Sequence, residues 1–468
     1  MRLCCVGCRP LRQWRSLCLL LVVRSRRSDV IEYIARAMRS ADLRARVVFT
    51  LVMLCVFRLG VFVPSPGVDR IALGEFFQDN QQSLLNLYDL FSGGALSQFS
   101  VFVLGIMPYI SASIILQLGQ LVVPQLERLK SEGQTGRKRI GQYTRVLTVV
   151  IAVVQSFFIA LSIEQMRTAS DVSVVIEAGW AFRGLTVISM TAGSCFVMWL
   201  GEQITERGIG NGASLIIVGG IVAGVPSSVG ALRNLVDNGE MTLLEIALFA
   251  VFMVVVVASI VFVERGLRKV PISYAKRVAR RGAGDAAPQS AHLPLKVNVA
   301  GVVPAIFASS VIMIPGTIGA FYNHPLFAWL SAQFVPGGWI YNATYVLLVV
   351  FFSFFYTAVS FSPMDLADNL RRNGGYIPGH RPGGDTVAFL DRLILRLTTG
   401  GSLYLAAVCI LPTILISEYG LPFYFGGTGL LIVIGVALDT VAQIESYLLT
   451  DEYSDVAITS GGRREFGV

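Results

Sequence analysis

Long runs of apolar residues recur along the chain, and polar connections separate them. Each run is about 20 residues long, which is the length that an α-helix needs to cross a bilayer core of roughly 30 Å. The alternating ten-residue pattern of an outer-membrane barrel is absent from the sequence. The pattern predicts an all-α polytopic membrane protein with ten spans, near 47–63, 101–123, 143–163, 183–200, 210–225, 242–263, 299–321, 341–361, 393–416 and 427–449.

One of these runs, GIMPYISASIILQL (105–118), carries a regular stripe of isoleucine. Ile106, Ile110 and Ile114 are four residues apart, so they follow one slanting face of a helix. Lipid accepts any apolar face and does not require such regularity. The stripe therefore indicates a more specific neighbour than lipid.

Composition agrees with a membrane protein. The chain has 468 residues, of which 54% are hydrophobic and only 15% are charged, and its mean hydropathy is +0.65. Soluble domains carry about 25% charged residues. The net charge of +8 would suggest nucleic acid as the partner of a soluble protein, whereas in a membrane protein the location of the charge is more informative.

Lysine and arginine alternate between successive connections. The segment before the first span carries eleven arginines, and the 124–145, 264–298 and 362–396 connections carry six, eight and five basic residues. The 322–340 and 417–426 connections carry none. Because cytoplasmic loops are enriched in Lys and Arg, we expect both termini in the cytoplasm and an even number of spans.

The two loops 264–298 and 362–396 are long, basic and rich in Gly and Pro. They could serve as orientation signals that are also attracted to anionic lipids. They could equally form a docking surface for a large acidic partner such as ribosomal RNA or an acidic protein. Composition alone leaves both interpretations open.

Motifs of enzymes and cofactor proteins are missing from the sequence. There is no G-x-x-x-x-G-K-[ST] phosphate loop, and the three histidines, His292, His324 and His380, fall in predicted loops. The glycine cluster GIGNGAS (208–214) favours a tight helix start and close packing. We expect no enzymatic activity, no cofactor and no metal site.

Two charged residues fall inside predicted spans, where charges are functional by default. Arg58 is near the outer third of the first span, and we expect it to snorkel outward. Asp439 lies in the middle of the last span and is either a buried structural partner or an ion-coupling site. An ion-coupled secondary transporter is therefore the alternative function, and a membrane scaffold without a conduit is a third.

Five long, collinear stretches resemble one family, the SecY/Sec61-alpha protein-conducting channels, and the resemblance covers about residues 40–455. The stretches are LFSGGALSQFSVFVLGIMPYISASIILQL (90–118), MWLGEQITERGIGNGASLII (198–217), HLPLKVNVAGVVPAIFASSVI (292–312), ADNLRRNGGYIPGHRPG (367–383) and PFYFGGTGLLIVIGVALDTVAQIES (422–446).

The resemblance implies ten helices in two inverted five-helix halves around a central hourglass pore, which opens sideways between helices 2–3 and 7–8. The halves would comprise residues 31–232 and 233–455, followed by a cytoplasmic tail at 456–468. Residues 1–30 lie outside the resemblance, and we expect this atypical basic extension to be disordered.

The resemblance also implies a ring of isoleucines that closes the pore, and a plug on its outer side at about 86–100. One further ring position falls on Ala213, where many relatives carry isoleucine. The implied ring residues are Ile110, Ile114, Ile217, Ile306 and Ile432, and the implied plug residues are Leu90, Phe91, Ser92, Gly93, Gly94, Ala95, Leu96 and Ser97.

With the resemblance, the two basic loops are interpreted as a landing site for partners that drive transport. Arg268, Lys269, Arg381 and Gly383 are the implied docking residues. The implied partners are the SecE and SecG subunits, the SecA motor, the ribosome and a membrane insertase, together with signal peptides and unfolded preproteins. The implied location is the bacterial cytoplasmic (inner) membrane.

Overall fold

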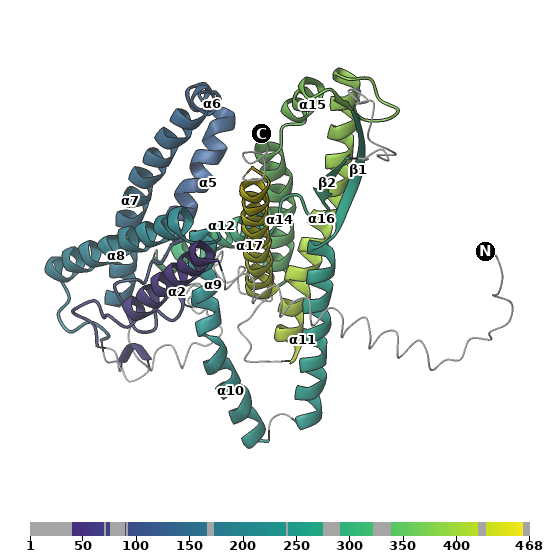
Figure 1. Ribbon diagram of the computed structural model, residues 1–468. Coiled ribbons are helices and arrows are strands. Elements are labelled where there is room, and N and C mark those ends of the chain that lie inside the picture. The colour runs from purple at the N-terminus through teal and green to yellow at the C-terminus, as the bar shows by residue number, and fades with distance from the viewer. Residues whose placement is uncertain are drawn as a thin grey trace, which may run out of the picture.

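The computed structural model of this chain describes residues 40–69, 72–74, 89, 92–165, 173–239, 242–274, 291–321, 338–419 and 427–461. These residues are mostly helical (Figure 1). The helices are α2 (Ala41–Val61), α5 (Met107–Val122), α6 (Pro124–Ser131), α7 (Gln134–Gln165), α8 (Trp180–Arg207), α9 (Gly212–Ala223), α10 (Val225–Asp237), α11 (Leu243–Glu264), α12 (Val303–Phe321), α14 (Trp339–Ser360), α15 (Pro363–Arg372), α16 (Gly384–Tyr419) and α17 (Gly427–Gly461).

Within the described residues, seven helices are long and apolar enough to cross a membrane. The helices α2, α5 and α12 lie at the other three predicted spans, so the count of ten stays a prediction. The qualifying segments are Gln134–Glu164, Trp180–Arg207, Gly212–Asn234, Leu244–Glu264, Trp339–Arg372, Gly384–Leu411 and Thr428–Leu448.

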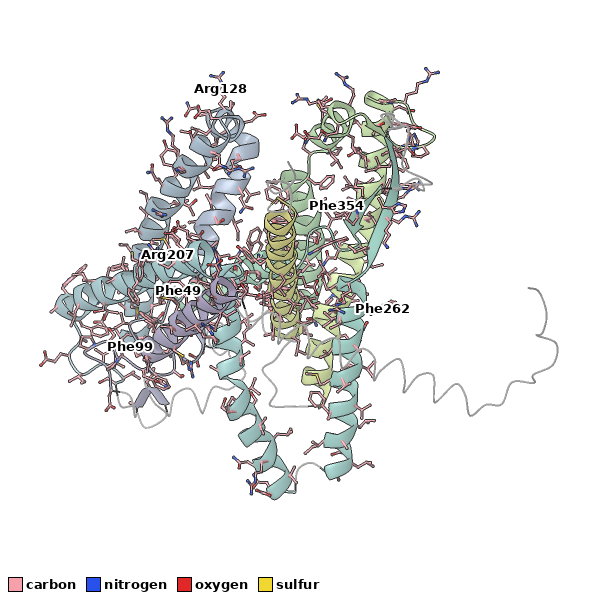
Figure 2. The ribbon with its side chains drawn as sticks, viewed as in Figure 1. Phe49, Phe99, Arg128, Arg207, Phe262 and Phe354 are labelled. Atoms are coloured by element: carbon pink, nitrogen blue, oxygen red, sulfur yellow. The ribbon has the colours of Figure 1, made fainter. Side chains whose placement is uncertain are left out.

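Several of these helices expose large apolar side chains, as expected for surfaces that contact lipid. The clearest case is α11, on which Leu244 is 80% exposed and Phe262 is 81% exposed. Figure 2 shows Phe262 pointing away from the neighbouring helices. A soluble chain of this kind would aggregate, so the surface supports a place in a membrane.

The predicted span 101–123 is wrong in its first turns, because α5 begins only at Met107. Residues 101–106 form turns, and backbone hydrogen bonds tie this region to the segment after α2: Ser65 N–H donates to the Phe99 carbonyl (2.8 Å) and Val101 N–H donates to the Val63 carbonyl (3.0 Å). Gly105 has φ +52°, which no continuous helix allows. Apolar composition alone could not distinguish these packed turns from a helix.

The polar connection 124–145 is also not a loop. It forms the short helix α6 and the first turns of α7, and α7 has 32 residues. At 1.5 Å per residue α7 is about 48 Å long, so it projects well beyond a core of roughly 30 Å. Figure 2 labels Arg128 at the end of the molecule where α6 connects to α7.

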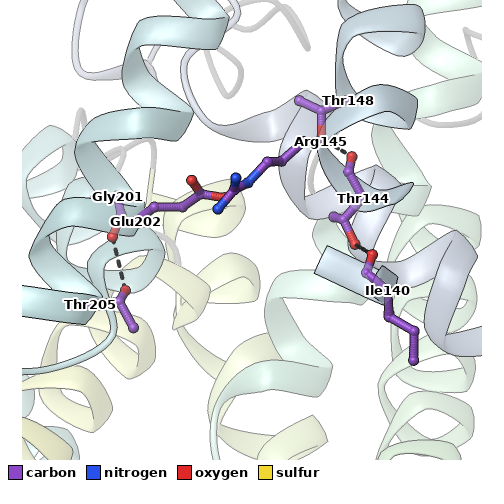
Figure 3. Close-up of polar contacts among 7 residues, drawn as sticks. All are labelled: Ile140, Thr144, Arg145, Thr148, Gly201, Glu202 and Thr205. Atoms are coloured by element: carbon purple, nitrogen blue, oxygen red, sulfur yellow. Dashed lines mark hydrogen bonds and ion pairs between the residues drawn. The ribbon is translucent and has the colours of Figure 1, made fainter. Parts of the chain in front are cut away.

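Two ion pairs join α7 to α8, one toward each end of the helix pair. Arg145 donates to Glu202 at 2.7 Å, and Figure 3 shows the two side chains reaching toward each other between the helices. Arg183 donates to Glu164, also at 2.7 Å. These two contacts connect the ends of a long antiparallel helix pair.

The expectation of an all-α fold missed a small sheet. The strands β1 (Leu267–Tyr274), β2 (Ala291–Lys296) and β3 (Gly375–Tyr376) pair antiparallel in the order β2-β1-β3. In β1, Val270 and Ile272 are buried while Arg268 and Lys269 are exposed. Charged residues dominate these loops in the sequence, so their short strand pattern is not apparent from composition.

The turn at 208–211 confirms the interpretation of the glycine cluster as a tight helix start. Asn211 caps α9 by accepting a hydrogen bond from the Ala213 N–H at 3.1 Å. The turn is also bound to distant helices: Ile209 N–H donates to the Thr50 hydroxyl of α2 (3.1 Å), and Gly210 N–H donates to Gln443 of α17 (2.8 Å). The helices α2 and α17, the first and last among the described residues, are thereby linked through one turn.

Gly212→Ala tests this packing. A Cβ added at Gly212 would lie 1.9 Å from the Gly201 carbonyl oxygen, so α8 and α9 would have to separate. We expect a stability loss of about 1–3 kcal/mol, the usual cost of overpacking. Gly230→Ala is the matched control, because a Cβ there meets nothing within 4 Å and Ala favours a helix by about 0.5–1 kcal/mol. Thermal unfolding in detergent compares the two variants, and equal midpoints would contradict the packing.

Candidate pore collar, plug and cytoplasmic platform

The five implied ring isoleucines, which we call the collar, all belong to one larger cluster of buried residues. They come from four helices that are far apart in the sequence: α5, α9, α12 and α17. Their exposed fractions are 6% for Ile110, 4% for Ile114, 2% for Ile217, 5% for Ile306 and 0% for Ile432. Figure 1 shows α12 and α17 in the middle of the molecule, between the side that holds α5, α6 and α7 and the side that holds α11, α16 and the sheet.

Direct helix contacts hold the collar together. The helix α12 packs against both α5 and α17, and α17 packs against α9. Between α12 and α5, the Ser310 hydroxyl donates to the Met107 sulfur at 3.8 Å, which is a weak bond. Ala213 lies against the same cluster but is only partly buried. The collar is therefore a hydrocarbon contact with little polar bonding across it.

The described part of the implied plug packs directly beside the collar. Leu90 and Phe91 lie outside the described residues. Ala95 is fully buried in the same cluster as the isoleucines, and Leu96 is buried in a second cluster with Phe99. The described residues 89 and 92 are helical, and residues 93–99 form turns, with φ +74° at Gly93 and +83° at Gly94.

Asp89 organises the turns of the plug. Its carboxylate accepts hydrogen bonds from the backbone N–H groups of Leu96 (2.8 Å) and Ser97 (3.0 Å), and its own carbonyl accepts one from the Ser92 hydroxyl (2.9 Å). Burial raises the pKa of Asp89, and the hydrogen bonds from Ser97, Leu96 and Ser92 oppose this shift. The carboxylate thus substitutes for a helical hydrogen-bond pattern in this segment.

Arg58 contacts the plug, a partner that the expectation of outward snorkelling did not include. Its guanidinium donates to the Gly93 carbonyl and stacks on the Phe62 ring, 5.3 Å from the centroid. In the sequence Arg58 is an isolated charge in the first span, and a backbone carbonyl gives no signal that could identify its partner.

Gly93 also brings the plug against a backbone. A Cβ added there would lie 2.8 Å from the Gly220 Cα of α9 and 3.4 Å from the Arg58 guanidinium. Only glycine allows this approach, because the neighbouring atom belongs to the backbone and cannot move aside. The plug is thus packed between α2 and α9.

The two basic loops join into one unit, which we call the platform. It consists of the sheet β2-β1-β3, α15 and the start of α16, and its buried cluster contains Val270, Leu295, Ala367, Ile377 and Leu390. Figure 1 shows the sheet and α15 at the same end of the molecule as α6, opposite the ends of α10 and α11. Long loops of the sequence therefore form a folded surface.

The implied docking residues all lie on the platform and three of them are exposed. Arg268 and Lys269 lie on β1 and face Leu295 and Pro294 of β2 across the sheet. The Arg381 backbone is fixed at both ends, since its N–H donates to Asp385 (3.3 Å) and its carbonyl accepts from the Thr386 hydroxyl (2.8 Å). The exposed guanidinium of Arg381 is thus presented from a rigid backbone.

Gly383 serves the geometry of this turn. It has φ +115°, a conformation that favours glycine, and its carbonyl accepts the Val387 N–H at 3.1 Å in the first turn of α16. Beside it, the His380 ring lies 4.2 Å from the Phe389 ring. A bulkier residue at Gly383 would strain the turn that carries Arg381.

Asp439 forms an ion pair with Lys296 at 3.1 Å, where β2 meets α17. Both side chains are more than half exposed, so Asp439 is not buried as one interpretation required. The contact links the platform to the last helix, and it supports the structural role over ion coupling. Within the described residues, no group of three or more His, Cys, Asp or Glu could hold a metal ion.

Helices of membrane-spanning length, an aliphatic collar and a plug packed against it define a helical membrane protein of the channel class. The model of the SecY family matches residues 100–441. The protein translocase subunit SecY of Escherichia coli (strain K12) is 44% identical over 416 residues, covering 88% of this chain and 93% of the relative. Its counterpart in Pseudomonas aeruginosa is 43% identical over 420 residues, with 89% and 93% covered. The chain belongs to the SecY family.

Solved structures share the fold. One described as "The structure of a protein conducting channel" aligns with a TM-score of 0.61 at 15% identity, covering 87% of this chain and 93% of the other. Sec61 in a canine ribosome–channel complex from the endoplasmic reticulum aligns with a TM-score of 0.57 at 14% identity and the same coverage. The described helices thus have the arrangement of SecY and Sec61 channels.

Ile377→Ala tests whether the platform is one folded unit. Ile377 is 2% exposed in the platform cluster, and removing its buried methyl groups should cost about 2–5 kcal/mol. We expect faster limited proteolysis in both 264–298 and 362–396. Met364→Ala on α15 is the control, because Met364 is 66% exposed. If cleavage accelerates in only one of the two loops, the loops do not form one unit.

Proposed function

We propose that this chain is the channel subunit of a Sec translocon, which passes unfolded polypeptides across the cytoplasmic membrane and releases transmembrane segments sideways into it. The observation that carries the proposal is the collar, in which isoleucines of four separate helices meet beside a packed plug. A scaffold without a conduit has no need for such convergence.

The chemistry of the collar suits this task. A translocating chain would stick to a wall that offered charged or hydrogen-bonding partners, and isoleucine offers neither. Its χ1 angle is also stiff, so the constriction keeps its shape. A narrow apolar constriction expels water and thereby blocks ions, whose transfer into an apolar medium costs tens of kcal/mol. The plug would add a second seal on the outer side.

The lateral opening is proposed to lie between α5 and α7 of the first half and α12 and α14 of the second half. The proposed halves, residues 31–232 and 233–455, would each contribute five helices with inverted orientation, and both termini would be cytoplasmic. The weak hydroxyl–sulfur bond between Ser310 and Met107 supports this location, because such a contact separates easily.

The platform is proposed as the docking surface for the SecA motor and the ribosome. Arg268, Lys269 and Arg381 present cations from one rigid unit, and nucleic acid or an acidic protein surface complements them. The structural relative described as ribosome-bound is consistent with this surface. We further propose SecE, SecG and a membrane insertase as partners, signal peptides and preproteins as substrates, and anionic lipids at the basic loops.

An ion-coupled transporter is not favoured. The two charges that the sequence placed inside spans, Arg58 and Asp439, have protein partners at Gly93 and Lys296. Neither of them is free to bind a coupling ion.

Ile110→Asn tests the collar as a seal. A polar amide in the collar would hold water and weaken the apolar contact, so we expect ion leak through bilayers to rise about tenfold, a shift of about 1.4 kcal/mol in the closed–open equilibrium. Export of preproteins with defective signals should rise as well. Ile115→Asn is the control, because Ile115 is 50% exposed on another face of α5. Equal conductance of the Ile110→Asn variant and the parent would contradict the seal.

Arg381→Glu tests the docking surface. Reversing this exposed charge should reduce motor-driven translocation at least about tenfold, by repelling an acidic partner, while the protein still folds. Arg139→Glu reverses an exposed charge of α7 outside the platform and should have a small effect. Protease-protected preprotein in reconstituted vesicles is the measurement, and normal translocation by the Arg381→Glu variant would refute docking at this residue.

A further inference from the structure

We propose that Arg58 of α2 is the positioning residue that latches the plug against the collar, by binding the Gly93 carbonyl in the turns that Asp89 organises. The inference rests on the proposed function, since it assumes that residues 92–97 seal the channel. It assigns a role to a membrane-embedded charge that neither the collar nor the platform requires.

The first observation is the bond itself. The Arg58 guanidinium donates to the backbone carbonyl of Gly93, at the start of the described plug turns. Hydrogen bonds from charged groups are roughly twice as strong as neutral ones, and few competing water molecules are expected beside an apolar collar. A bond to a carbonyl also does not depend on which side chains the plug carries.

The second observation is that Asp89 fixes the turns that present this carbonyl. The Asp89 backbone carbonyl accepts the Gly94 N–H, next to Gly93, at 2.9 Å. Its carboxylate holds the following turn through Leu96 and Ser97. Arg58 therefore bonds to the carbonyl of Gly93 within turns that Asp89 organises.

The third observation is that Arg58 is itself anchored. Its guanidinium stacks on Phe62, one turn along the chain, and the neighbouring Phe57 is buried and stacks on Phe102 with ring centroids 6.1 Å apart. Gly60 allows this approach, because a Cβ there would lie 1.9 Å from the Phe102 ring. The arginine is thus presented from a helix face that is locked to the segment following the plug.

The aliphatic contacts of the plug could not set its position alone. Ala95 and Leu96 would pack acceptably over a range of small shifts, since hydrophobic contact is not directional. The hydrogen bond from Arg58 to Gly93 is directional and defines one position. A latch of one such bond is also weak enough to break when a signal peptide enters.

The test uses a thiol at a buried plug position. Ser92 is 3% exposed, and Ser92→Cys changes only oxygen to sulfur. In the full chain, with all seven native cysteines replaced, a membrane-impermeant maleimide applied to spheroplasts should label Cys at this position slowly. Adding Arg58→Met, which keeps an unbranched stem of similar length, should raise the labelling rate about tenfold. Arg58→Lys should rescue part of the effect.

The matched control is Arg183→Met. Arg183 is also paired with an acid, Glu164 at 2.7 Å, and stacked on an aromatic ring, Trp180 at 5.0 Å, but the contacts of its side chain are at α7 and α8 and not at the plug. It should leave labelling at position 92 unchanged. If Arg183→Met raises labelling as much as Arg58→Met does, the effect is general loosening and the latch is overturned.

A double-mutant cycle tests whether Asp89 acts through the latch. Asp89→Asn keeps the acceptor oxygen for Leu96 and Ser97 but weakens those bonds by removing the charge, so we expect a rise of about threefold in labelling in the parent and none in the Arg58→Met background. Independent effects of the two changes would overturn the role of Asp89 in the latch.

Two experiments distinguish the hypothesis that the plug seals the channel from the hypothesis that Arg58 latches the plug. Deletion of residues 92–97 should raise ion conductance if the plug seals the channel. If the deletion does not leak but Arg58→Met still exposes position 92, the latch stands and the sealing role fails. If Arg58→Met leaves labelling unchanged, the latch is overturned whatever the deletion does.

Discussion

The contact of aliphatic side chains from α5, α9, α12 and α17 is the interaction on which the rest of the structure depends. A channel for polypeptides must exclude ions while it is closed, yet its wall cannot bind the chain that passes. Nonpolar side chains meet both demands, because they dewet a narrow constriction and offer no hydrogen bonds. Such contacts have no direction, so other parts of the molecule must define the position of each helix.

Polar contacts away from the collar fix the positions of the helices. The turn at 208–211 binds α2 and α17 through Thr50 and Gln443, and the Lys296–Asp439 pair links the platform to α17. On the plug, Asp89 and Arg58 organise a short series of turns. Hydrogen bonds and ion pairs thus fix the positions of the helices, while the surface that these helices present to the pore is apolar. Movement then requires the breaking of few bonds.

Much of the fold could be predicted from hydropathy, because membrane-spanning helices must satisfy their own backbone and therefore appear as long apolar runs. A helix lies at each predicted span, although the start of α5 was wrong, because packed turns near Gly105 are as apolar as a helix. The sheet of the platform was missed, since its strand pattern is short and charged residues dominate the composition of these loops. The contact between Arg58 and Gly93 was also missed, because a backbone carbonyl leaves no trace in a sequence. The convergence of the five isoleucines, by contrast, followed from the family resemblance and not from any local pattern.

The most direct test of the collar as the path of the polypeptide is photocross-linking to a preprotein arrested during translocation. A photoreactive residue is introduced in turn at positions 110, 114, 217, 306 and 432, and at the exposed positions 115 and 222 on α5 and α9 as controls. The account predicts cross-links to the arrested chain from all five collar positions and none from the two controls. Cross-links from the controls with none from the collar would contradict it.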